Sequence, residues 1–127
     1  MDRPPDDDTR DPAAAQPGPA SLDHRRLDQL EGHLGLSRAE IVATLAAELA
    51  TAIAGIESAL ADGDLHRAGL AAHAARNSAL LIDAQPLLER LRTLETSARG
   101  GDLPAARAAQ DGVGLAWAAL RDVLSAS

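Results

Sequence analysis

Large apolar side chains recur at steps of four, four, four, three and four between Ile41 and Leu60, and this spacing constrains the fold more than any other feature. Residues three and four apart lie on one face of an α-helix, so the segment predicts a long amphipathic helix with a continuous apolar stripe. Such a stripe has to be buried against other elements of the chain. Its six members are Ile41, Leu45, Leu49, Ile53, Ile56 and Leu60.

The composition indicates that those other elements are helices as well. Alanine and leucine dominate, Trp117 is the one aromatic residue of the Phe, Tyr and Trp types, and cysteine is absent. Helix formers outnumber the β-branched and aromatic residues that favour strands, which predicts an all-α fold. Without cysteine, disulfides, thiolate metal sites and thiol catalysis are excluded. The 127 residues suffice for one domain with one core.

Residues typical of helix N-termini divide the chain from about residue 22 onward into a short lead-in helix and four longer helices. Ser37 and Glu40 have the spacing of a capping box, which begins the helix of the apolar stripe. Asp64, Asp83 and Asp102 are the expected caps of the next three helices. Because the connections are short, we expect an antiparallel up-and-down four-helix bundle with a short N-terminal lead-in helix.

Residues 1–20 differ in kind from the rest of the chain. They hold five prolines and a run of aspartates with hardly any large apolar group, so we expect a disordered acidic tail followed by a helical bundle over 21–127. The formal net charge of −7 argues against a nucleic-acid partner. We identify neither a stretch of about 20 apolar residues nor a secretory leader, which predicts a cytoplasmic protein without membrane insertion.

Polar side chains gather on one side of the third predicted helix, in the stretch "AAHAARNSALLIDA". If the alanines of that helix form its packed stripe, His73 lies at the stripe's edge with Arg76 and Asn77 one turn further along. Gly69 and Leu70 precede the histidine by one turn. A half-exposed neutral imidazole is a nucleophile that suits a phosphoryl group, and a guanidinium one turn away can hold that group's oxygens.

The same stretch resembles the histidine-containing phosphotransfer domain of multistep phosphorelays. That family has a histidine followed by a hydrophobic residue at +2, lysine at +3, glycine at +4, a small residue at +5, Gly-Ala at +10 and +11, and Leu-Glu near +21 and +22. The likeness extends over roughly Leu22 to Leu124. The matching positions here are His73, Ala75, Arg76, Asn77, Ser78, Asp83, Ala84, Leu94 and Glu95.

The resemblance implies a monomeric phosphocarrier rather than a true enzyme. His73 would accept a phosphoryl group from an aspartate of one receiver domain and pass it to another, with Arg76 stabilising its charge in place of lysine. The partners would be response-regulator receiver domains and a hybrid sensor kinase. Mg²⁺ would belong to the receiver domain, so we expect no cofactor or metal in this chain. Its partner-binding residues would be Gly69, Leu70, Asn77, Ser78 and Leu80.

Other interpretations of these residues stay open. Asn77 stands where the family pattern has glycine, so its side chain could crowd an incoming receiver, and the chain could be a non-phosphorylated adaptor that binds a receiver through the same helix face. His73 could also be an ordinary surface residue of a purely structural bundle. His66 could be a second acceptor or a metal partner, although its separation from His73 favours a solvated side chain.

Overall fold

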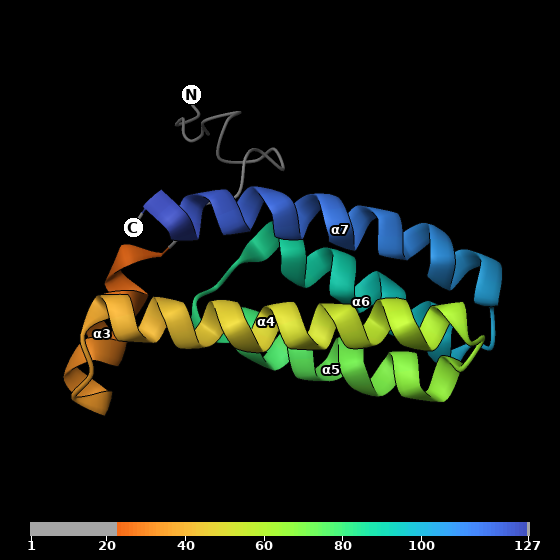
Figure 1. The fold of residues 1–127 in the computed structure, drawn as a ribbon, viewed down its shortest axis with the longest axis horizontal. Helices are drawn as coiled ribbons and strands as arrows, with labels where there is room; N and C mark the ends of the chain where they lie inside the picture. Colours follow the sequence, from red (N-terminus) through yellow and green to blue (C-terminus); the bar gives the residue numbers. More distant parts are fainter. Residues whose placement is uncertain (1–22, 127) are drawn as a thin grey trace, which may run out of the picture.

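The computed structural model describes residues 23–126, which form five α-helices and no strand (Figure 1). The predicted tail over 1–20 lies outside the described residues. The helices are α3 (His24–Leu34), α4 (Arg38–Ala61), α5 (Leu65–Leu81), α6 (Gln85–Arg99) and α7 (Leu103–Ala126).

The four long helices run alternately up and down along one another, and short α3 lies across one end of α4 (Figure 1). Consecutive helices pack together, and α4 also contacts α7, which closes the bundle. The predicted all-α bundle with its lead-in helix is therefore confirmed. This arrangement exposes one long side of α5 and places its other sides against α4 and α6.

Three of the predicted helix starts are confirmed by side-chain caps. Ser37 and Glu40 form a complete capping box: the Ser37 hydroxyl accepts from the Glu40 N–H at 3.2 Å, and the Glu40 carboxylate accepts from the Ser37 N–H at 2.9 Å. Asp64 accepts from the Arg67 N–H at 3.0 Å. Asp102 accepts from the Ala105 N–H at 3.0 Å.

The predicted cap of the fourth helix is wrong. The residue that precedes α6 is Ala84, which provides no side-chain cap, while Asp83 lies one position earlier with φ of 52°. This left-handed conformation is costly for most residues and free for glycine, and aspartate tolerates it better than most side chains. The Asp83 carboxylate accepts from the Gln85 amide at 2.5 Å. Asp83 therefore serves the turn between the helices rather than the helix start.

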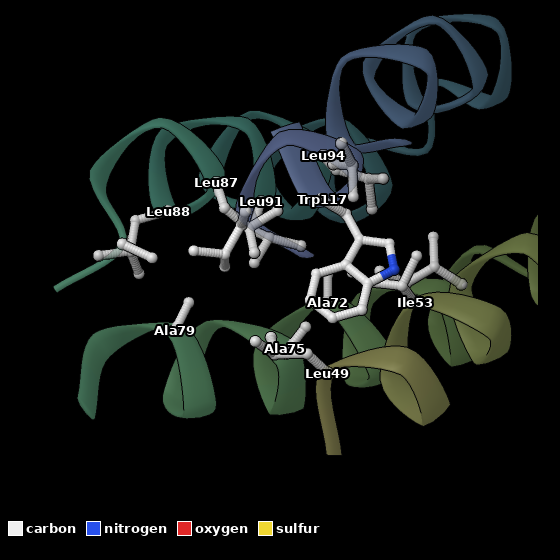
Figure 2. Packing of buried hydrophobic residues seen from close by; sticks show 14 of the residues in the cluster. Leu49, Ile53, Ala72, Ala75, Ala79, Leu87, Leu88, Leu91, Leu94 and Trp117 are labelled. Atoms are coloured by element: carbon white, nitrogen blue, oxygen red, sulfur yellow. The ribbon is translucent and has the colours of Figure 1, made fainter. Parts of the chain in front are cut away.

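The core pairs small side chains on α5 with large ones on its neighbours. Four alanines of α5 are fully buried and form its packed stripe, and opposite them lie the leucines of α6 (Figure 2). The Trp117 indole points into the bundle from α7 and is buried (Figure 2). Because alanine is small, α5 packs closely against its neighbours, which fixes its rotation. The four alanines are Ala68, Ala72, Ala75 and Ala79.

Helix α4 corrects one expectation from the sequence. By length and composition it is apolar enough to cross a membrane, so the prediction that the chain lacks a sufficiently long apolar stretch is wrong. All six residues of its predicted stripe are buried in the bundle core. Length and composition alone are weak evidence for a membrane span, since core helices satisfy the same criterion.

Candidate functional site

The buried alanines of α5 orient its polar residues. With Ala72 and Ala75 turned into the core, the His73 side chain emerges beside α6 and is 51% exposed. Its ring is thus attached to a rigid helix and is still open to solvent. This position at the edge of the packed stripe is the one that the sequence predicts for His73.

A buried carboxylate of α6 lies beneath the imidazole. Glu95 is 4% exposed, and its Oε2 lies 3.3 Å from Nδ1 of His73. The same oxygen accepts from Arg99 at 2.8 Å, and Oε1 lies 3.5 Å from Nε of Arg76. Two guanidinium groups therefore compensate the buried negative charge, as a charge in such a place requires.

Arg76 also contacts the histidine directly. Its Nη2 lies within hydrogen-bond distance of Nδ1 of His73, at 3.2 Å, and its side chain is 30% exposed. Arg76 therefore reaches the imidazole and the Glu95 carboxylate at once. The structure brings together His73 and Arg76 as the sequence predicts, and it adds Glu95 and Arg99 to them.

The surface around the ring is open and partly apolar. Leu70 is 59% exposed and Leu80 is 50% exposed. Asn77 is exposed on the same side of α5. Gly69 lies against α6, where an added Cβ would meet Cβ of Ala98 at 3.7 Å. That distance is an ordinary van der Waals contact, so α5 and α6 pack closely at Gly69 but leave room for a Cβ.

Ser78 is not part of this group. It is 9% exposed and its hydroxyl donates to Oε1 of Glu48 on α4 at 3.2 Å. Ser78 lies five residues beyond His73, which is about 140° around the helix, so its side chain points toward α4 while the imidazole points toward α6. It borders a shallow groove of about 460 Å³ between α4 and α5. The structure thus gives Ser78 a contact between helices rather than one beside the histidine.

Two contributors were missed or left without a role by sequence reasoning. Glu95 matches the family pattern at +22, but no function was derived for it. Arg99 was not identified, although its position four residues after Glu95 on one helix is the spacing of an ion pair. Within residues 23–126, no group of three or more His, Asp or Glu side chains is arranged to hold a metal ion.

The fold matches that of a known protein. The crystal structure of histidine-containing phosphotransfer protein B (HptB) from Pseudomonas aeruginosa PAO1 superposes with a TM-score of 0.75 at 24% identity, covering 82% of this chain and 90% of that chain. No protein-family model matches the sequence, and no curated protein matches it either. At this identity the likeness establishes the fold, so the predicted resemblance is confirmed as a shared bundle architecture.

Proposed function

We propose that this protein is a phosphocarrier that holds a phosphoryl group on Nε2 of His73 and exchanges it with aspartates of receiver domains. The observation that supports this most strongly is the exposed imidazole whose Nδ1 lies 3.3 Å from the buried Glu95 carboxylate. The shared fold with a histidine-containing phosphotransfer protein supports the same proposal. The chain would act as a carrier, and the partner would supply catalysis.

The transfer step follows from the two ring nitrogens. With the proton on Nδ1 and donated to Glu95, Nε2 keeps its lone pair in a ring that is half exposed. Nε2 attacks phosphorus, the N–P bond forms as the P–O bond to the aspartate breaks, and the aspartate leaves as a carboxylate with the electron pair. The ring becomes a cation that the Glu95 carboxylate stabilises. The reverse reaction delivers the group to the next receiver domain.

Arg76 is suited to the transferred group as well as to the ring. Its guanidinium is always charged and presents donors in a fork that matches phosphoryl oxygens. From its position beside Nδ1, a change of rotamer would bring it toward a group on Nε2. Mg²⁺ would be held by the receiver domain, where it would offset charge on the phosphoryl oxygens.

The docking surface would be the exposed side of α5. Leu70 and Leu80 supply apolar area on the two sides of His73 along the helix, and Asn77 adds a polar group between them. An apolar patch around a polar centre is the arrangement that a partner-binding surface needs. We expect the partners to be receiver domains of response regulators and of a hybrid sensor kinase, and we expect this exchange to occur in the cytoplasm.

The adaptor and the carrier differ in whether Asn77 covers the imidazole of His73. A silent adaptor would have its imidazole covered by Asn77, whereas here the imidazole is half exposed and Asn77 is exposed beside it. A purely structural bundle offers no reason for a buried carboxylate beneath an exposed histidine. These observations favour the carrier.

The test is phosphotransfer from phosphorylated receiver domains of the same genome to the full chain. We expect acid-labile, alkali-stable label on the wild type and none on His73→Gln, while both bind the receiver domain. Binding without any transfer to the wild type would favour the adaptor. Label that persists in His73→Gln would exclude His73 as the acceptor.

A further inference from the structure

One ring nitrogen of His73 faces two neighbours with opposite requirements. Arginine has only donors, so the Arg76–His73 hydrogen bond at 3.2 Å requires Nδ1 to be the acceptor. A carboxylate has only acceptors, so Glu95 at 3.3 Å can bond Nδ1 only when that nitrogen carries a proton. A neutral imidazole has one N–H, and Nδ1 cannot serve both neighbours.

The two choices differ in reactivity. When Nδ1 accepts from Arg76, the proton is on Nε2, and Nε2 has no free lone pair with which to attack phosphorus. When Nδ1 donates to Glu95, Nε2 is free to attack. The neighbour that holds Nδ1 thus decides whether His73 is a nucleophile.

We propose that Arg76 is a positioning residue that keeps resting His73 in the Nε2–H tautomer and releases it when a phosphoryl group arrives. This inference rests on the proposed function, since it describes how the same acceptor is activated. On release, the Nε2–H bond breaks and a Nδ1–H bond forms by proton exchange with water, so the ring stays neutral. The exposure of the imidazole gives water access to it.

The arrival of a phosphoryl group favours release because of the strength of the competing bonds. A guanidinium binds a charged phosphoryl oxygen more strongly than a neutral acceptor such as Nδ1, and its fork of donors can hold two phosphoryl oxygens at once. Arg76 therefore gains by turning to the incoming anion. Glu95 stays in place because Arg99 holds the same carboxylate at 2.8 Å. Nδ1 is then left with Glu95 as its partner, and Nε2 becomes nucleophilic only when its substrate is present.

The tautomer can be read directly from ¹⁵N chemical shifts of the imidazole in the unphosphorylated full chain. The spectra are recorded at a pH above which the His73 shifts no longer change, so that the ring is neutral. We expect the Nε2–H tautomer in the wild type and a shift toward Nδ1–H as inorganic phosphate is added. A wild-type ring that is already Nδ1–H without phosphate would overturn the proposal, and this measurement needs no variant.

A neutral electrophile tests whether Arg76 controls the tautomer of His73 or only attracts an anionic phosphoryl donor. Diethyl pyrocarbonate carries no charge, so Arg76 cannot help to bind it. We expect Arg76→Met, which removes the donors and keeps an unbranched chain, to raise acylation of His73 by about two- to tenfold, which corresponds to the net free energy of one typical intramolecular hydrogen bond. Phosphorylation by the anionic donor phosphoramidate should fall in the same variant. His66, exposed on the same helix, is the internal control and should acylate equally in both proteins.

The outcomes distinguish the inference from the proposed function. Equal acylation of His73 in wild type and Arg76→Met would overturn the proposed control of the tautomer by Arg76. It would not count against the proposal that His73 carries a phosphoryl group. The expected ¹⁵N shifts in a protein that no receiver domain phosphorylates would overturn the function alone. Circular dichroism of Arg76→Met verifies that the helices remain formed.

Discussion

Oε2 of Glu95 lies 3.3 Å from Nδ1 of His73, so a buried carboxylate of α6 contacts an exposed imidazole of α5. Residues of two different helices thereby meet at one side of the bundle. This contact links the fold to the proposed chemistry, because the packing of the α5 alanines against α6 sets where the histidine emerges.

Replacing Glu95 by glutamine is expected to slow phosphorylation of His73 by about 10- to 100-fold, because a hydrogen bond to a charged group contributes about 1.5–3 kcal/mol. The amide keeps the shape of the side chain and loses the charge that stabilises the imidazolium. The measurement is the rate of labelling by phosphoramidate. Glu89→Gln, an exposed site on the same helix, is the control and should keep the wild-type rate. An unchanged rate in Glu95→Gln would contradict the role of the carboxylate.

Asn77 is expected to influence docking rather than chemistry, because its side chain is exposed beside the ring. Asn77→Leu should leave labelling by phosphoramidate unchanged and slow transfer from a receiver domain, since only the larger donor has to pack against α5. Asn77→Gly should lower the free energy of unfolding by a few tenths of a kcal/mol, about the difference in helix propensity. Faster labelling of Asn77→Gly by the small donor would show instead that Asn77 crowds the ring.

The turn at Asp83 predicts a stabilising substitution. Because φ is 52°, Asp83→Gly removes a steric cost and should raise the free energy of unfolding by about 1 kcal/mol, whereas Asp83→Val should lower it by about 1–2 kcal/mol. Urea unfolding followed by circular dichroism measures both. Asp62→Gly is the matched control, because Asp62 has a right-handed conformation with φ of −84° and should gain nothing. Equal effects at the two sites would contradict the conformational explanation.

The capping box of α4 predicts a pH-dependent stability. The backbone N–H of Ser37 bonds the Glu40 carboxyl and holds its pKa below the ordinary value, with the Ser37 side chain adding to the shift. A lowered pKa in the folded state means that this contribution is complete above the unfolded pKa of about 4.5 and is lost as the pH falls through the folded pKa.

Urea unfolding at neutral pH and in the acid range measures this contribution. We expect the free energy of unfolding of the wild type to fall as the pH is lowered, and that of Glu40→Gln to fall by less. Ser37→Ala is expected to cost about 0.5–2 kcal/mol at neutral pH, the range for loss of an N-cap. A Glu40→Gln variant with the same pH dependence as the wild type would assign the acid sensitivity to other carboxylates.

Much of the fold could be predicted because the signals are local. The apolar stripe of α4 and the caps at Ser37, Asp64 and Asp102 depend on residues within one helical turn, and each was found where predicted. Asp83 was misassigned because an aspartate before a helix is compatible with both a cap and a left-handed turn, and only the path of the chain decides between them.

The site was predicted in part. His73 and Arg76 share a helix face, so their proximity follows from spacing. Their meeting with Glu95 depends on the rotation of α6 against α5, which is set by packing and has no local signal. Ser78 matched a family pattern, but its position five residues after His73 places its side chain about 140° around the helix, where it contacts α4.

The central claim is that Nε2 of His73 carries the phosphoryl group, and the most direct measurement is to map the label on the full chain after incubation with phosphoramidate. Mass spectrometry under alkaline conditions identifies the residue, and ³¹P–¹⁵N coupling identifies the nitrogen. We predict one acid-labile phosphoryl group on Nε2 of His73 and none in His73→Gln. A wild-type protein that takes up no acid-labile label, or label on another histidine that persists in His73→Gln, would contradict the claim.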